Sequence, residues 1–192
     1  MANADSRPPS DHLLRTLAAV PVNSQILDLG CGHGRHTEAL LRLGFPVHAC
    51  DPDAEAVQAT RDTIAGLLEQ GDADTVVREA SLDDLDYPDA TFDWVVAVEA
   101  ETYARNEAEL QTLFEEGRRV LKPGGWLYVS LPAAQDGGGG RPDGEEGRFS
   151  EEVVDRQRSA ADLAEASEPT HIEGDSPRIR AIYRRVEPHT PV

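Results

Sequence analysis

From residue 11 to residue 131 the chain alternates between short apolar runs and segments whose apolar residues recur at helical spacing. Apolar runs bounded by turn residues predict buried strands, and apolar residues three and four positions apart predict helices that pack by one face. The predicted strands cover residues 25–29, 47–50, 75–80, 94–98 and 126–131. The predicted helices cover residues 11–20, 37–43, 53–70 and 107–121. This alternation predicts a doubly wound α/β sheet, with parallel strands and helices on both faces.

The chain beyond the fifth predicted strand has a different composition. Residues 133–149 are rich in Gly, Asp and Glu, which predicts a mobile loop placed to act as a lid. A helix is predicted at 160–166, with Ser159 as its N-cap, followed by strands at 171–173 and 179–186. These two strands predict an antiparallel C-terminal hairpin that completes a mostly parallel sheet.

The length and composition of the chain fit a single domain over residues 1–192, with 1–22 as an N-terminal helix and lead-in. No apolar run approaches the ~20 residues that cross a bilayer, and residues 1–10 lack the apolar core of a signal peptide. We therefore expect a cytoplasmic protein with no membrane partner. Cys31 and Cys50 fit neither a zinc pattern nor a disulfide framework, so we expect reduced thiols and no metal site.

The charge of the chain argues against nucleic acid as a partner. The formal net charge is -18 at pH 7, the pI is near 4.6, and the arginines are scattered along the sequence. Such a chain repels phosphate backbones unless it has a local basic patch. Lys122 is the only lysine, whereas Asp and Glu total 36. A chain this acidic suits high intracellular salt, where screening reduces self-repulsion, and we hypothesise a halophilic source.

The strongest chemical signal is a glycine-rich segment between the first predicted strand and the helix after it, Asp28-Leu29-Gly30-Cys31-Gly32-His33-Gly34. Glycines permit a close approach of ligand to backbone and allow positive φ angles. A dinucleotide fingerprint, G-x-G-x-x-G, requires its third glycine at residue 35, where the chain has Arg35. The G-x-G-x-G spacing therefore disfavours an NAD-dependent oxidoreductase, which stays as the less favoured alternative.

Two further motifs follow the glycine segment in order. Asp51 ends the second predicted strand, and Leu121-Lys122-Pro123-Gly124-Gly125 precedes the fifth. With these three motifs the sequence resembles class I S-adenosylmethionine-dependent methyltransferases, with a type-11-like or type-25-like methyltransferase domain. The resemblance implies a Rossmann-like fold and S-adenosylmethionine as the cofactor.

The resemblance also implies which residues contact the cofactor. The glycine segment would hold the methionine part, Asp51 would accept hydrogen bonds from both ribose hydroxyls, and Pro52 would pack on the adenine. Ser81 and the backbone of Leu82 would meet the adenine ring, with Asp83 taking the place of Ser81 if the alignment shifts. The implied cofactor-binding residues are Asp28, Gly30, Cys31, Gly32, Gly34, Asp51, Pro52, Ser81, Leu82 and Glu99.

The sequence gives weaker evidence for the catalytic residues and for the identity of the methyl acceptor. Glu99, Glu101 and Tyr103 follow the fourth predicted strand, where donor and acceptor would meet, but they also fit an ordinary solvated loop. A sulfonium is already a strong electrophile, so alignment and water exclusion are the main tasks and a base is optional. The segment Val98-Glu99-Ala100-Glu101 lacks the Pro-Pro-aromatic motif of enzymes that methylate amino groups of DNA bases. We expect methyl transfer to O, N or S of a small molecule, the alternative being a cofactor-binding domain without catalysis.

Overall fold

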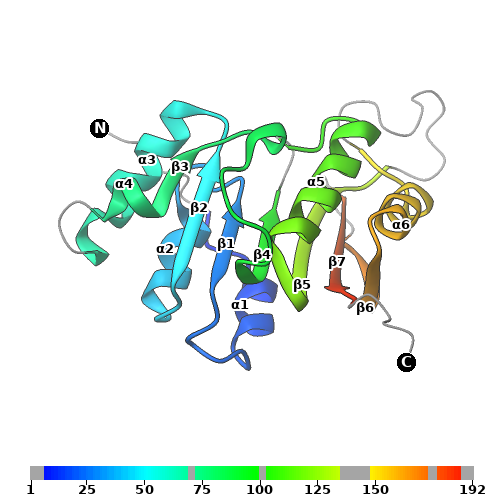
Figure 1. The fold of residues 1–192 in the computed structure, drawn as a ribbon, viewed down its shortest axis with the longest axis horizontal. Helices are drawn as coiled ribbons and strands as arrows, with labels where there is room; N and C mark the ends of the chain where they lie inside the picture. Colours follow the sequence, from blue (N-terminus) through cyan, green and yellow to red (C-terminus); the bar gives the residue numbers. More distant parts are fainter. Residues whose placement is uncertain (1–6, 69–71, 100–102, 135–147, 173–176, 187–192) are drawn as a thin grey trace.

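A computed structural model of the chain describes residues 7–68, 72–99, 103–134, 148–172 and 177–186 (Figure 1). Within these ranges seven strands form one sheet in the order β3-β2-β1-β4-β5-β7-β6. The strands are β1 Ile26–Leu29, β2 Val47–Asp51, β3 Val77–Glu79, β4 Phe92–Val98, β5 Leu121–Pro132, β6 Leu163–Ile172 and β7 Arg178–Arg185. The helices are α1 Asp11–Leu17, α2 Arg35–Arg42, α3 Ala54–Ile64, α4 Ala73–Val76, α5 Glu107–Val120 and α6 Glu151–Ala160.

The sheet has the predicted doubly wound arrangement. β1 pairs in parallel with β2 and β4, β2 with β3, and β4 with β5, whereas β7 pairs antiparallel with both β5 and β6. The order turns back at β1, because β2 lies on one side of it and β4 on the other. In open α/β sheets ligands bind outside the carboxyl ends of the strands at such a switch point. The topology therefore directs attention to the segments that follow β1, β2 and β4.

Helices cover both faces of the sheet, because successive side chains of a strand point to opposite faces. On one face Leu27, Val95 and Leu127 pack in the cluster that contains the buried residues of α5 and α6. On the other face Ile26 and Val96 pack in the cluster of α1 and α2. Figure 1 shows α5 lying across β4 and β5, and α6 beside β6 and β7. Burial on both faces explains why β1 is apolar except for one residue, Asp28.

The C-terminal elements differ from the prediction. The helix lies at Glu151–Ala160, where Ser150 caps it by accepting from the backbone N–H of Val153. The predicted helix at 160–166 is wrong, because Asp162 has a φ of 51° and Leu163–Ile172 forms the edge strand β6. The predicted strand at 171–173 is therefore only the end of a longer strand, while the antiparallel pairing with β7 is confirmed.

Smaller corrections concern the middle of the chain. The third strand is shorter than the predicted 75–80, because Ala73–Val76 forms α4 and only Val77–Glu79 pairs with β2. The helix predicted at 53–70 ends at Ile64, and a short 3₁₀ turn, Ala65–Leu67, follows it.

The ends of the acidic segment that was predicted as a loop are packed. Ala133 and Phe149 form a β-bridge and are both buried, whereas residues 135–147 lie outside the described part of the chain. Cys31 and Cys50 are free, buried thiols, as predicted. Among the helices that the structure describes, none has the length and apolar character needed to cross a membrane.

Candidate functional site

The glycine segment forms a tight turn between β1 and α2. Gly32 and Gly34 have φ angles of 53° and 84°, in the left-handed region that glycine adopts without strain. A Cβ added at Gly32 would meet nothing within 4 Å, so the space beside this backbone is open. At Gly34 the same atom would lie 3.1 Å from the Cα of Thr60, because the turn packs closely against α3. The hydroxyl of Thr60 donates to the carbonyl oxygen of Gly32 at 2.7 Å and fixes the turn.

Two acidic side chains, those of Asp28 and Asp51, form hydrogen bonds with residues in and around this turn. Asp28 in β1 is 1% exposed, and its Oδ2 accepts from the hydroxyl of Thr37 at 2.6 Å. Burial raises the pKa of Asp28 to about 6, against the opposing effect of the Thr37 hydrogen bond. Asp51 ends β2, and its two oxygens accept from the backbone N–H groups of Gly32 at 2.9 Å and Asp53 at 3.0 Å. The Asp51 carboxylate therefore ties the glycine turn to the carboxyl end of the neighbouring strand.

Asp51 is not the residue that caps α3. Asp53 is the N-cap of α3, since its Oδ1 accepts from the backbone N–H of Glu55 at 2.9 Å. A carboxylate has about four acceptor positions, and the two hydrogen bonds to Asp51 use half of them. Asp51 therefore keeps acceptor capacity for further donors beside the open backbone of Gly32.

A first cavity, which we call the Pro52 pocket, is lined in part by the residue that follows Asp51 in the chain. It has a volume of about 340 Å³ and is lined by Pro52, Ser81, Leu82, Asp83, Tyr103, Arg105, Glu109 and Thr112. The structure thus brings together the residues after β2 and β3 that the sequence singled out for the adenine. The hydroxyl of Tyr103 is turned away from the solvent and donates to the carbonyl oxygen of Ala80 at 2.8 Å. Burial raises the pKa of Tyr103 above its usual value, so this hydroxyl stays protonated.

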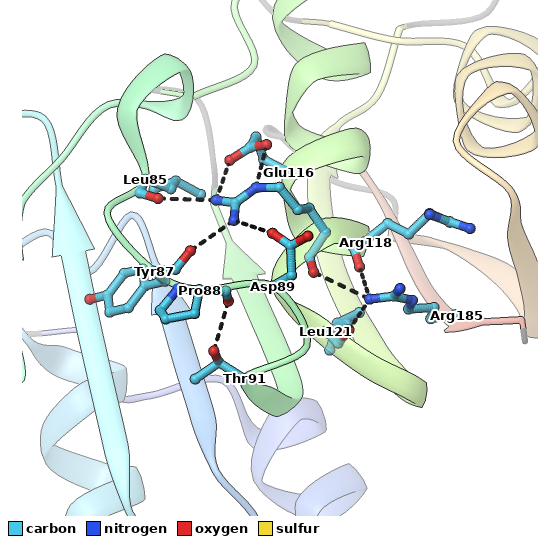
Figure 2. A network of polar contacts seen from close by, with 10 residues as sticks. Leu85, Tyr87, Pro88, Asp89, Thr91, Glu116, Arg118, Leu121 and Arg185 are labelled. Carbon is cyan, nitrogen blue, oxygen red and sulfur yellow. Dashed lines mark hydrogen bonds and ion pairs between the residues drawn. The ribbon is translucent and has the colours of Figure 1, made fainter.

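The segment that follows Leu82 is held by Arg119 of α5, for which the sequence contains no signal. The Arg119 guanidinium donates to the carbonyl oxygens of Leu85 at 3.0 Å and Tyr87 at 2.7 Å. It also pairs with Glu116 at 2.7 Å and with Asp89 at 2.9 Å, and hydrogen bonding to Glu116 raises its pKa further. Figure 2 shows the two backbone carbonyls and the two carboxylates converging on one guanidinium.

The end of α5 is hydrogen-bonded to the C-terminal strand β7. Arg185 of β7 donates to the carbonyl oxygens of Arg118 at 3.0 Å and Arg119 at 3.2 Å, and also to that of Leu121 (Figure 2). These bonds satisfy carbonyl groups at the end of α5, which have no partner within the helix. The loop beside the Pro52 pocket is therefore anchored, through α5, to the opposite half of the sheet.

A second cavity, which we call the arginine pocket, lies at the carboxyl ends of β4 and β5. It has a volume of about 490 Å³ and is lined by Pro8, Ser10, Asp11, His12, Arg15, Arg35, Val98, Glu99, Ser130, Ile172, Arg178 and Arg180. Four arginines that are far apart in the sequence are thus gathered in space.

Glu99 belongs to this second cavity and not to the lining of the Pro52 pocket. It has a φ of 56°, and its Oε2 pairs with Arg35 at 2.9 Å and Arg7 at 3.0 Å. Arg35 is the first residue of α2 and follows Gly34 directly, so the Glu99–Arg35 pair joins the glycine turn to the wall of the arginine pocket. Glu101, the other predicted acid, lies outside the described residues.

A mostly parallel, doubly wound sheet with a glycine turn and an acid at its switch point is typical of proteins that bind a nucleotide-type cofactor at this edge. The family model described as a methyltransferase domain matches residues 26–125, which is more than half of the chain. The chain therefore belongs to the methyltransferase domain family.

Individual relatives agree with this family. The human mitochondrial ubiquinone biosynthesis O-methyltransferase is 34% identical over 128 residues, covering 62% of this chain and 33% of that protein. A dimethylglycine N-methyltransferase from Parasynechococcus marenigrum is 33% identical over 130 residues, covering 66% and 44%. The chain spans less than half of the length of the curated relatives it matches.

The solved structures show the same fold. A SAM-dependent methyltransferase from Methanosarcina mazei superimposes with a TM-score of 0.74 at 18% sequence identity. The match covers 94% of this chain and 99% of that one. This likeness confirms the Rossmann-like architecture and the mostly parallel sheet with antiparallel C-terminal strands.

Proposed function

We propose that this protein is an S-adenosylmethionine-dependent methyltransferase that transfers a methyl group to an O, N or S atom of a small molecule. The observation that carries the proposal is the contact of Asp51 with the open glycine turn, together with the position of the next residue, Pro52, in the lining of the Pro52 pocket. Membership of the methyltransferase domain family supports it.

The residues at this place suit the cofactor in shape and in chemistry. The open space at Gly32 leaves room for the amino-acid part beside the backbone. The remaining acceptor positions of Asp51 suit the two adjacent hydroxyls of a ribose, because a carboxylate offers two oxygens to two donors. Pro52 and Leu82 offer apolar surface for an adenine ring in the Pro52 pocket, and Ser81 or Asp83, which line the same pocket, would accept from its amino group.

The remaining implied residues act indirectly in this proposal. Asp28 and Cys31 are buried, and each contacts a threonine that braces the turn: Thr37 for Asp28 and Thr60 for Cys31. In this proposal they stabilise the glycine turn and do not contact the cofactor themselves. Tyr103 uses its hydroxyl to hold the backbone at Ala80, which positions the wall of the Pro52 pocket.

The cofactor, when bound, supplies an electrophilic methyl group. This chain then needs to hold the acceptor in line with that group and to exclude water, tasks that positioned side chains perform without proton transfer. Tyr103 stays protonated and Glu99 is paired with two arginines, so neither suits the role of a base. We therefore propose catalysis by alignment, with the protein acting as a cytoplasmic enzyme on a small-molecule acceptor.

Calorimetric titration with S-adenosylhomocysteine tests the proposal. We expect binding to the wild type and a loss of about tenfold or more for Asp51→Asn, because a hydrogen bond to a charged group contributes about 1.5–3 kcal/mol. Asp53→Asn is the matched control: it keeps an N-cap residue on α3 and lies two positions away. Equal affinity of the two variants, or preferential binding of NAD, contradicts the proposal.

A second measurement separates catalysis from binding alone. Turnover of S-adenosylmethionine to S-adenosylhomocysteine in the presence of a pool of small metabolites is the expected result. Binding without turnover against any extract fraction favours the alternative, a cofactor-binding domain without catalysis.

A further inference from the structure

The arginine pocket carries positive charge in a protein whose formal net charge is -18. Among the residues that the structure describes, its lining contains four arginines and two carboxylates. Arg15 pairs with Asp11 at 3.2 Å, and Arg35 pairs with Glu99 at 2.9 Å. The two described carboxylates are therefore matched by two of the arginines, and Arg180 has no ion pair among the residues that the structure describes.

Arg178 and Arg180 come from one strand and face the same way. They are two residues apart in β7, so their side chains leave the same face of the sheet. The residues between and beyond them, Ile179 and Ala181, are buried in the core on the opposite face. In the antiparallel register Arg180 lies opposite Ser130 and Arg178 opposite Pro132, at the carboxyl end of β5. Both guanidinium groups are thus delivered to the edge of the sheet where the glycine turn lies.

The two guanidinium groups differ in how the protein holds them. Arg178 is fixed by Ser130, donating from Nε to its hydroxyl at 2.9 Å and from Nη2 to its carbonyl oxygen at 2.8 Å. The Nε of Arg180 is buried and has no hydrogen-bond partner among the residues that the structure describes. A buried donor without an acceptor costs about 1–3 kcal/mol, and more when the group is charged. Arg180 also lines the cavity, so an anion bound there would meet a guanidinium that no described carboxylate pairs with.

The pKa of His12, which also lines the pocket, is affected by the same positive charge. His12 lies against Tyr128, with 3.2 Å between its Nδ1 and the tyrosine hydroxyl oxygen. Desolvation lowers the pKa of His12, and the charges of Arg180 and Arg15 lower it further. Part of this lowering of the His12 pKa thus comes from the positive charge of the arginines in the pocket.

We propose that the arginine pocket binds an anionic oxygen group of the methyl acceptor, a carboxylate or a phosphate, with Arg180 as the principal contact and Arg178 beside it. This inference rests on the proposed function, which it deepens by naming the substrate class. The guanidinium fork matches both anions, since each presents two oxygens to two N–H donors. Val98 and Glu99, at the end of β4, connect this pocket to the glycine turn through Arg35.

Arginine Nε–H resonances in two-dimensional ¹⁵N NMR spectra provide the test, with acetate, inorganic phosphate and acetamide as probes. At constant ionic strength we expect acetate or phosphate to shift the Nε–H signal of Arg180 in a saturable way. Acetamide, which has the shape of acetate without its charge, should not shift it. A response to acetate alone identifies a carboxylate site, and a response to phosphate alone identifies a phosphate site.

Two matched variants test whether the anion binds at Arg180. Arg180→Gln should weaken the binding of the responding anion by about fivefold or more, because charge-assisted hydrogen bonds are about twice as strong as neutral ones. Arg184→Gln is the control, since Arg184 leaves the same face of β7 at the other end of the sheet, opposite Trp126. Its guanidinium lies 5.2 Å from the Trp126 ring centroid, outside the pocket.

The outcomes separate this inference from the proposed function. If neither anion shifts Arg180, or if acetamide shifts it equally, the anion site is refuted, and this result needs no variant to fold. If S-adenosylhomocysteine binds but no anion does, only the substrate class is wrong. If an anion binds but S-adenosylhomocysteine does not, the role in acceptor binding is refuted together with the proposed methyl transfer.

Discussion

Replacement of Asp28 by Asn tests how a buried carboxyl beneath the glycine turn affects folding stability. Burial raises the pKa of Asp28 from 3.8 to about 6, and the nearby charge of Asp51 adds to this rise. A carboxyl whose pKa is higher in the folded state binds its proton more tightly there. Its ionisation therefore weakens the fold as pH rises from about 4 to about 6. A shift of about two pKa units corresponds to about 3 kcal/mol of unfolding free energy.

The assay is urea unfolding of wild type and Asp28→Asn at several pH values and one fixed salt concentration. The variant retains an oxygen that accepts from Thr37 but has no titratable proton, so its stability relative to wild type should rise by about 3 kcal/mol from pH 4 to pH 7. Thr37→Val removes the hydrogen bond that lowers this pKa, so its stability should continue to fall to a higher pH than that of wild type. A difference between wild type and Asp28→Asn that does not change with pH refutes the reasoning.

Three further perturbations have defined outcomes. Arg119→Met should lower the unfolding free energy by about 2–3 kcal/mol, because two backbone carbonyls lose a charged donor. Arg42→Met, on the exposed face of α2, should cost under about 0.5 kcal/mol, and urea titrations measure both. Gly34→Ala should cost more in thermal unfolding than Gly44→Ala: both have positive φ, but only at Gly34 does the new Cβ meet Thr60, so equal losses contradict the packing argument. The -18 charge predicts loss of stability at low ionic strength and recovery in molar potassium chloride, and stability independent of salt removes the halophilic hypothesis.

The parallel half of the fold was predictable because its strands are buried on both faces. β1 and β4 are continuous apolar runs, interrupted only by one acid each, and they occur within a residue or two of the predicted positions. The acids at Asp28 and Asp51 stand out against this background for the same reason. Local sequence therefore predicted the glycine turn and its two carboxylates.

The edge strand β6 could not be recognised in the same way. It pairs with a neighbour on one side only, and its pairing with β7 shifts register between Glu165 and Ser167 and again before Thr170. Most of the segment from Glu165 to Thr170 is exposed, so it lacks the alternation of apolar and polar residues that marks a half-buried strand. Pro169 is tolerated because an edge strand needs fewer backbone donors.

The arginine pocket was beyond prediction because its residues come from distant parts of the chain. Its lining joins α1, the start of α2, the ends of β4 and β5, and β7. The spacing of arginines along the sequence says nothing about this assembly, which depends on the antiparallel register that places Arg180 opposite Ser130.

Arg35 belongs both to the glycine turn region and to the arginine pocket. A glycine there would complete the dinucleotide spacing, but it would also remove the cation that pairs with Glu99 at 2.9 Å. Arg7 would then be the nearest described cation to that carboxylate, at 3.0 Å, and the arginine pocket would lose one of its four positive charges. Because Arg35 follows Gly34 directly, the turn that suits a cofactor and the pocket that suits an anionic acceptor share one wall. The substitution that distinguishes this turn from a dinucleotide site thus also contributes to the charge of the second cavity.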